Sequence, residues 1–291
     1  MHIDAHQHFW RLADRLGQWP PATLDAIHRD FMPGDLLPML ATSGIAGTIL
    51  VQSQASLEDN HFMLELAEKH DFILAVVGWV DLKNAHAPMQ IARLAQRPKF
   101  KGVRPMLQDL PDPQWIDDAV LEPAIEAMVQ HALCLDALVL PVHLPALAAF
   151  AERYPALSIV IDHAAKPPIA AGQVEPWQTD LAALAALPNV SCKLSGLLTE
   201  AGTRADADGL APYVSTLLEH FGPERLIWGS DWPVLKLAGD YRAWRVMAEG
   251  LCARWHARRA PQGSHFERVR EAIFGGNAQR FYRLSAPQAA T

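Results

Sequence analysis

The sequence predicts an α/β fold, a single (β/α)8 barrel of the TIM type with parallel strands, over residues 1–291. Eight short β-rich runs recur along the chain, and segments with apolar residues at helical spacing separate them. An open doubly wound sheet would also alternate in this way. Such a sheet usually has a glycine-rich phosphate turn after its first strand, and none is present here, so a barrel is favoured.

The predicted strands cover residues 2–9, 46–54, 73–80, 100–107, 133–143, 157–164, 189–196 and 225–232. Amphipathic segments at 57–70, 121–132 and 144–155 predict helices between them, the last ending at Pro155. Strands that alternate with helices form βαβ units, and eight such units close into a barrel of about 250 residues. The chain shows no internal repeat, low-complexity tract or linker, so one domain is expected.

Composition narrows the class of protein. Half of the 291 residues are hydrophobic and 20% are charged, which is enough for a packed core. The net charge is -7 without a Lys/Arg cluster, so nucleic acid is not an expected partner. The three scattered cysteines are typical of reduced, buried thiols. Because the sequence shows neither a signal peptide nor an apolar stretch of about 18 residues, we expect a cytoplasmic protein that does not span a membrane. The oligomeric state stays open.

Polar residues end nearly every predicted strand. Barrels of this type carry their catalytic groups at the C-terminal ends of strands, and the strands themselves are expected to be buried on both faces. We therefore expect the active site at this end of the barrel. In chain order these residues are His6, His8, Gln52, Gln54, Trp79, Asp81, Arg104, His143, His163, Lys193, Ser195 and Asp231.

The first strand places three ionisable residues two apart, which predicts a common face. His6 and His8 would point the same way, roughly 6.5–7 Å apart along the strand, so that their ring tips can converge on one atom. Asp4 is expected on that face one layer lower, where either support of a histidine or a purely structural role is plausible.

Covalent catalysis is not favoured. The GSDW stretch around Ser230 does not match the G-x-S-x-G nucleophile motif, and Ser230 should face away from Asp231. Cys192 also lacks a neighbouring base on its own side of the strand.

Six stretches in order along the chain resemble the amidohydrolase superfamily, in particular its branch of small-lactone hydrolases that act on L-fuconolactone, L-rhamnonolactone and 2-pyrone-4,6-dicarboxylate. They are IDAHQHFW (3–10), FKGVRPMLQD (100–109), IVIDHAAKPPI (159–169), CKLSG (192–196), LIWGSDWPV (226–234) and IFGGNAQRFYRL (273–284). The resemblance covers essentially the whole chain. It implies a site built from His6 and His8 of the first strand, His143 of the fifth, His163 of the sixth and Asp231 of the eighth.

The resemblance also bears on metal content. Superfamily members with two metals carry a carboxylated lysine or a glutamate at the end of strand four, whereas this chain has Arg104 there. Arginine has no lone pair with which to bridge two cations. At most one divalent ion is therefore expected, zinc being the first choice, with His6, His8, His143 and Asp231 as candidate ligands. Because some members of the branch work without metal, the ion is not expected to be essential.

The resemblance implies hydrolysis of a sugar-acid lactone, with L-fucono-1,5-lactone or a related aldonolactone as the first choice. Asp231 would act as general base for the attack of water. The oxyanion would be stabilised by His6, His8, His143, His163, Arg104 or one metal ion. The expected catalytic residues are Asp231, His163, His143 and Arg104.

The polarity of the substrate is a separate question. A dicarboxylate calls for two or more cationic groups, and the strand ends offer one clear candidate, Arg104. Aromatic faces and amides suit a neutral, hydroxyl-rich ring. The expected substrate-binding residues are His6, His8, Gln52, Gln54, Trp10, Trp79, Trp232 and Lys193.

Three alternatives remain open at this stage. A 2-pyrone-4,6-dicarboxylate-type lactonase would share the reaction. A metal-dependent non-oxidative decarboxylase would share the histidines and the aspartate but would release carbon dioxide without consuming water. An inactive barrel that serves as a binding protein would not need ionisable groups at so many strand ends.

Overall fold

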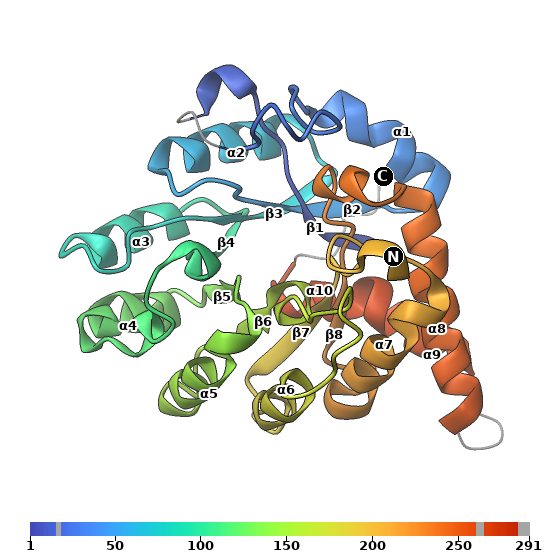
Figure 1. Cartoon of the computed structure of the whole chain (residues 1–291). Helices are drawn as coiled ribbons and strands as arrows, with labels where there is room; N and C mark the ends of the chain where they lie inside the picture. The colour runs from blue at the N-terminus through green and yellow to red at the C-terminus, as the bar shows by residue number, and fades with distance from the viewer. Residues whose placement is uncertain (16–18, 260–264, 285–291) are drawn as a thin grey trace.

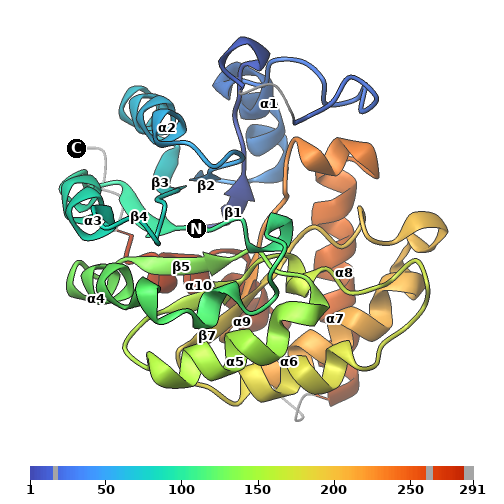
Figure 2. The ribbon, with the colours of Figure 1, turned by 60° about the vertical axis from the view of Figure 1, so that its left-hand side comes forward.

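The computed structural model describes residues 1–15, 19–259 and 265–284. Eight parallel strands pair in chain order from β1 to β8, and helices lie around their outside (Figure 1, Figure 2). The predicted (β/α)8 barrel is therefore confirmed. The strands are β1 (Ile3–Gln7), β2 (Gly47–Val51), β3 (Ile73–Gly78), β4 (Phe100–Val103), β5 (Cys134–Ala137), β6 (Ile159–Ile161), β7 (Val190–Leu194) and β8 (Leu226–Trp228).

A helix follows each strand, and two short helices, α9 and α10, end the described chain. In the part of the chain that the structure describes, no helix is both long enough and apolar enough to cross a membrane. The helices are α1 (Pro33–Ser43), α2 (Leu57–Lys69), α3 (Ala87–Ala95), α4 (Glu122–Gln130), α5 (Leu144–Arg153), α6 (Trp177–Ala185), α7 (Ala207–Phe221), α8 (Tyr241–Arg259), α9 (Phe266–Glu271) and α10 (Asn277–Phe281).

The strands divide their side chains between two apolar clusters. The outer cluster packs strand residues such as Val190 and Leu194 against the helices. The inner cluster fills the barrel with small and branched side chains, among them Ile3, Ala75 and Val160. Successive strand residues point to opposite faces, so alternate residues along each strand enter the two clusters.

Strand β5 is much shorter than the sequence predicts. It ends at Ala137, whereas the prediction continued the strand to residue 143. The LVLP run that follows has strand-like composition, but it leads into a turn of 3-10 helix, Pro141–His143, that starts α5. Pro141 cannot donate to a sheet ladder, so the strand does not run on to residue 143. His143 therefore lies beyond the strand end.

Strand β1 contains a bulge that changes the direction of its side chains. Asp4 pairs with Thr48 and Gln7 pairs with Leu50, so β1 has one more residue than β2 over this stretch. An inserted residue reverses the alternation beyond it. Asp4 accordingly points out toward Tyr241 of α8, while His6 points into the barrel mouth toward Lys193. The expectation that Asp4 shares the face of His6 was wrong for this reason.

The barrel closes where β1 meets the segment after β8. The His8 backbone N–H donates to the Trp232 carbonyl at 2.8 Å, and the Asp231 N–H donates to the His6 carbonyl at 2.8 Å. Gly229 permits this approach, because a Cβ there would lie 2.7 Å from the His6 Cβ. The closure places Asp231 directly beside His6 of β1 and beside His8, which follows β1.

Asp4 ties this closure together from the helix side. Its buried carboxylate accepts hydrogen bonds from the Ser230 N–H (2.8 Å), the Ser230 hydroxyl (2.6 Å), the His6 N–H (3.2 Å) and the Tyr241 hydroxyl (3.0 Å). Four donors, from β1, from the segment after β8 (the β8 loop, which contains Ser230 and Asp231) and from α8, thus meet on the Asp4 side chain. Asp4 has a structural role at the barrel closure.

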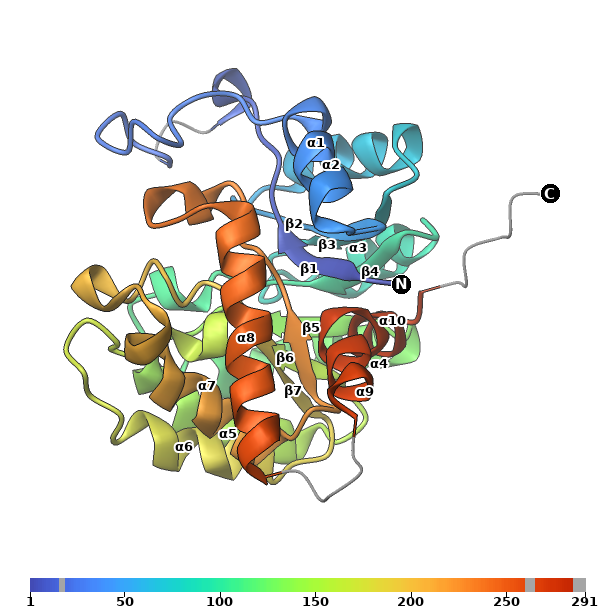
Figure 3. The same cartoon turned by 90° about the vertical axis from the view of Figure 1, so that its right-hand side faces the viewer.

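The C-terminal helices cover the opposite end of the barrel. Figure 3 shows α9 and α10 close to the N-terminus, beside β5 and β6. Tyr282, directly after α10, belongs to the inner apolar cluster and donates a hydrogen bond to Asp136 of β5 at 2.9 Å. This end is therefore closed, and access to the polar residues is from the C-terminal ends of the strands.

We expect Asp4→Asn to lower the free energy of unfolding by about 1–3 kcal/mol, because the amide NH2 would face donors instead of accepting from them. Chemical denaturation followed by circular dichroism measures the change. Asp14→Asn, which loses only an exposed ion pair with Arg11, serves as the matched control and should change little. Equal stability of the two variants would contradict the role of Asp4.

Candidate active site

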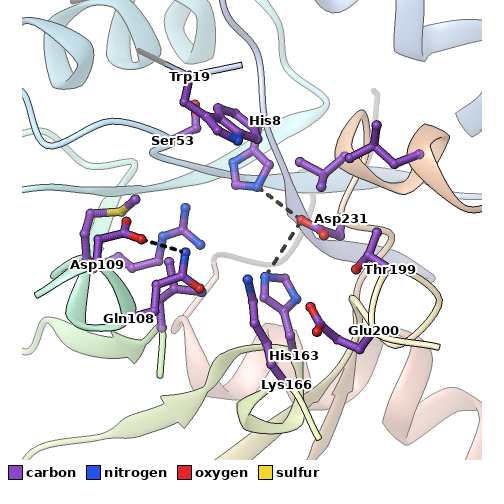
Figure 4. Close-up of a pocket in the computed structure, with 15 residues that line it drawn as sticks. His8, Trp19, Ser53, Gln108, Asp109, His163, Lys166, Thr199, Glu200 and Asp231 are labelled. Atoms are coloured by element: carbon purple, nitrogen blue, oxygen red, sulfur yellow. Dashed lines mark hydrogen bonds and ion pairs between the residues drawn. The ribbon is translucent and has the colours of Figure 1, made fainter. Parts of the chain in front are cut away.

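Three histidines surround one carboxylate oxygen at the mouth of the barrel. The Nε2 atoms of His8, His6 and His163 lie 3.3, 3.8 and 3.8 Å from Oδ1 of Asp231. Figure 4 shows the rings of His8 and His163 approaching Asp231 from opposite sides. All four residues are buried, with at most 4% of their surface exposed. The sequence-predicted His6, His8, His163 and Asp231 are thus brought together.

His163 reaches this position through a left-handed turn. Residues 163–166 all have φ between 51° and 60°, a region that costs a non-glycine residue about 1 kcal/mol or more. The Trp177 indole N–H holds the turn by donating to the Ala164 carbonyl at 2.7 Å. The His163 Nδ1 hydrogen-bonds Ser195 Oγ at 2.9 Å, and a Cβ on Gly196 would lie 2.5 Å from that nitrogen. The strained turn holds the His163 imidazole at the active site.

The electrostatics keep the imidazoles neutral and the carboxylate charged. Burial lowers the pKa of His163 to about 4, and burial lowers the pKa of His8 as well. Burial also lowers the pKa of His6 well below its ordinary value, to which the charge of Lys193 adds. Burial alone would raise the pKa of Asp231, but the three adjacent imidazoles hold it below its usual range. Asp231 is therefore ionised at neutral pH.

The hydrogen bonds of His8 bear on metal binding. Its Nδ1 lies 2.7 Å from the Val51 carbonyl, which can only accept, so the Nδ1 carries the proton. The Nε2 lone pair of neutral His8 then faces the charged oxygen of Asp231 at 3.3 Å. Two electron-rich atoms at this distance favour a cation between them, either a proton or a metal ion.

One group of side chains among the described residues has ligand atoms close enough to share a metal ion. It consists of His6, His163 and Asp231, whose ligand atoms all lie within 4.8 Å of one another. Two imidazole nitrogens and one carboxylate oxygen form a donor set typical of zinc sites. The residues therefore fit a single metal ion. His163 takes the place in this group that the sequence analysis assigned to His8 and His143.

Arg104 lies beside the histidines and is held from two sides. Its Nη1 lies 3.2 Å from Asp162 Oδ2 and 3.4 Å from His6 Nε2. Gln52 holds its backbone and side chain: the Gln52 amide donates to the Arg104 carbonyl at 2.8 Å, and Nη2 of Arg104 donates to the Gln52 carbonyl. Gln52 is fully buried and orients Arg104, whereas the guanidinium itself lines the cavity.

Lys193 lies beneath the site, inside the barrel. Its fully buried ammonium contacts Asp136 Oδ2 at 2.5 Å, Asp162 Oδ1 at 2.9 Å and His6 Nδ1 at 3.0 Å. Burial would lower the pKa of Lys193, but the two aspartates hold it above its ordinary value. Lys193 does not line the cavity, so direct contact with a substrate, as expected from the sequence, is not supported.

His143 also lies away from the cluster. Its Nδ1 accepts a hydrogen bond from the Leu140 N–H at 3.0 Å, within its own turn. The ring lines a small separate hollow with Leu107 and Trp115. The reason is the early end of β5, which leaves Leu138, not His143, at the cavity wall.

The expected tryptophans and Gln54 do not line the cavity either. Trp232 is 1% exposed and packs edge-on against Phe9 and Phe31 in the core. Trp10 and Gln54 line a different hollow, beside Arg15 and Asp59. Trp79 lines another one, which is separate from the hollow of His143.

The cavity above Asp231 has a volume of about 530 Å³, which suits a small ligand. Gln108 and Asp109 lie on one side of it, Thr199, Glu200 and Lys166 on another, and Trp19 at its edge (Figure 4). Sequence reasoning did not select these residues, because they lie in loops outside the strand ends. The quoted stretches FKGVRPMLQD and IVIDHAAKPPI nevertheless contain Gln108, Asp109 and Lys166.

The chain is similar to known proteins over nearly its whole length. The chain is 57% identical over 288 residues to an L-fucono-1,5-lactonase of Burkholderia ambifaria, covering 98% of this chain and 96% of that protein. It is 37% identical over 300 residues to an L-fucono-1,5-lactonase of Burkholderia multivorans, covering 99% and 97%.

A solved structure and a family model also relate the chain to amidohydrolases. A crystal structure of an amidohydrolase from Burkholderia multivorans with bound zinc superposes with a TM-score of 0.87 at 36% identity, covering 98% of this chain and all of that one. The family model described as amidohydrolase matches residues 3–284. The chain therefore belongs to the amidohydrolase family.

Proposed function

We propose that this chain hydrolyses L-fucono-1,5-lactone, or a closely related aldonolactone, to the free aldonic acid. The single observation that carries the proposal is the buried Asp231 carboxyl group, enclosed by three imidazoles at the base of a polar cavity. Two relatives that cover nearly the whole chain at 57% and 37% identity are L-fucono-1,5-lactonases. We place the reaction in the cytoplasm.

In the proposed reaction Asp231 accepts a proton from water as the water attacks the lactone carbonyl. A carboxylate with a lowered pKa is a weak base, but it is fully ionised and held at one place. The adjacent imidazoles stabilise Asp231 while its carboxylate takes up the proton and loses its negative charge. The proton then goes to the ring oxygen as the ester bond breaks, which completes the hydrolysis.

The oxyanion needs donors that are already in position. Arg104, fixed by Gln52 and Asp162, presents its guanidinium at the cavity wall. His163 and His6 provide further ring nitrogens near Asp231. Preorganised donors in a buried site stabilise developing charge more than they would in water. An ester with an alkoxide leaving group needs less help than an amide, so these groups can carry the reaction.

We also propose that one zinc ion, held by His6, His163 and Asp231, with the nearby His8, can occupy this site. When bound, such an ion polarises a carbonyl and lowers the pKa of bound water. The donor set and the zinc-bound relative of 36% identity support the assignment. Because Arg104 and the histidines already offer donors, we do not expect the ion to be essential.

The cavity wall favours a neutral, hydroxyl-rich ring. Gln108, Thr199 and Lys166 can donate to hydroxyl groups, and Asp109 and Glu200 can accept from them. Two cations, Arg104 and Lys166, line the wall, but three carboxylates, Asp109, Glu200 and Asp231, outnumber them, so a dicarboxylate would bring two further negative charges to a wall with excess negative charge, at a cost in binding. A decarboxylase would use similar histidines, but we find no feature of the described site that favours loss of carbon dioxide over hydrolysis.

The substrate assignment is tested with a panel of lactones and a pH indicator, since each hydrolysis releases a proton. We expect kcat/KM for L-fucono-1,5-lactone to exceed that for 2-pyrone-4,6-dicarboxylate by about 10²-fold or more, because of the charged wall. Blanks without protein correct for spontaneous opening of the ring. Turnover of the dicarboxylate alone would refute the proposal.

Asp231→Asn should reduce kcat by about 10²–10⁴-fold, because an amide cannot accept the proton. Steady-state assays with and without chelator separate this effect from any effect on metal binding. The matched control is Asp208→Asn, which removes an exposed charge paired with Arg254 on α8 and should keep full activity. If kcat of Asp231→Asn stays near that of the unaltered protein, Asp231 is not the base.

Exhaustive chelation should leave measurable lactonase activity, because the oxyanion donors belong to the chain. Metal analysis after dialysis against zinc should give at most one ion per chain, since Arg104 excludes a bridged pair. A complete loss of activity that zinc restores would show that the metal is essential.

A further inference from the structure

His6 is surrounded in an unusual way: each of its ring nitrogens faces one cation and one carboxylate. The Nδ1 lies 3.0 Å from Lys193 Nζ and 3.4 Å from Asp162 Oδ1. The Nε2 lies 3.4 Å from Arg104 Nη1 and 3.8 Å from Asp231 Oδ1. His8 differs, because the Val51 carbonyl fixes its proton on Nδ1.

A neutral imidazole carries one N–H and one lone pair, and the two can exchange places. With the proton on Nε2, Lys193 donates to Nδ1 and the N–H points toward Asp231. With the proton on Nδ1, the N–H points toward Asp162 and the lone pair of Nε2 faces the cavity. Partners of the required kind are therefore in place for both tautomers, and the charge of the ring is the same in each.

We propose that His6 has two roles selected by its tautomer. In the metal-free protein its proton is on Nε2, where it donates a hydrogen bond to the oxyanion of the lactone. A metal ion at this site would take Nε2 of His6 as a ligand: the ring would release its Nε2 proton to solvent and take one proton from solvent on Nδ1, so that its charge would not change. The first role rests on the function proposed above.

Lys193 decides the tautomer of the metal-free state. Its ammonium donates hydrogen bonds to Asp136 Oδ2 at 2.5 Å and to His6 Nδ1 at 3.0 Å, whereas its 2.9 Å contact with Asp162 Oδ1 is an ion pair without hydrogen-bond geometry. A proton on Nδ1 would remove one of these two hydrogen-bond acceptors from a fully buried ammonium, which is costly. The contact with Lys193 is also shorter than the 3.4 Å contacts that favour the other tautomer.

The proposal explains how one site can act with and without metal. A histidine whose proton is fixed on Nδ1, such as His8, can only offer a lone pair to the cavity. A histidine whose proton is fixed on Nε2 could donate but could not bind a metal. His6 can do either, because Lys193 and Asp162 both contact its inner nitrogen.

Long-range ¹H–¹⁵N correlation spectra of ¹⁵N-labelled protein distinguish the two tautomers directly. His6 is identified by comparison with His6→Gln. After chelation at neutral pH we expect the Nε2–H pattern, and after addition of zinc chloride the Nδ1–H pattern. An Nδ1–H or doubly protonated ring in the chelated protein, or no change with zinc, would overturn the proposal. These spectra need no substrate, so they stand even if no lactone is turned over.

Lys193→Met removes the donor to Nδ1, and in the chelated variant we expect His6 to shift to the Nδ1–H pattern. Lys83→Met, which breaks an exposed ion pair with Asp118, is the matched control and should keep the Nε2–H pattern. An unchanged His6 pattern in a folded Lys193→Met variant, as judged by circular dichroism, would contradict the role of Lys193.

If Lys193→Met does not fold, two replacements of His6 decide the question. The amide nitrogen of Gln falls near the position of Nε2, whereas that of Asn falls near Nδ1. In chelated protein we expect His6→Gln to keep about 10²-fold more lactonase activity than His6→Asn, the effect of one oxyanion donor. Equal rates would mean that His6 does not donate from Nε2.

Discussion

The hydrogen bonds that close the barrel between β1 and the β8 loop are the constraint on which the site depends. They place the His6 and His8 backbones directly against residues 231 and 232. Asp4 fixes this junction with four hydrogen bonds from three elements. Because Asp231 sits in the junction itself, with φ at 59°, the same contacts that complete the barrel also position the carboxylate.

A second constraint is the balance of buried charge below the cavity. Lys193 and Arg104 face Asp136 and Asp162, two cations and two anions that are each at most 3% exposed. Breaking such a set by removing one member leaves an uncompensated charge, which is strongly unfavourable. The pairing keeps these ions in place, and His6 is the link through which they reach the cavity. Barrel interior and active site are thus one continuous polar network.

Much of the site could be predicted because strand ends in a parallel barrel meet at one edge. His6, His8, His163, Arg104 and Asp231 were selected on that basis, and the structure brings them together. The prediction was wrong for His143, because β5 ends earlier than expected, and for Trp232, because this side chain packs in the core. The loop residues Lys166 and Glu200 gave no periodic signal, since loops have none.

The fold class, the catalytic edge of the barrel and the residue types available there can be read from the order of residues along the chain, because these follow from periodicity and from chain order. The direction of the side chains, in contrast, depends on the folded barrel. A one-residue bulge turned Asp4 outward and His6 inward, and no pattern in β1 announces it. Whether Lys193 meets a substrate or a histidine likewise depends on its depth in the barrel, which arises only when eight strands close around it.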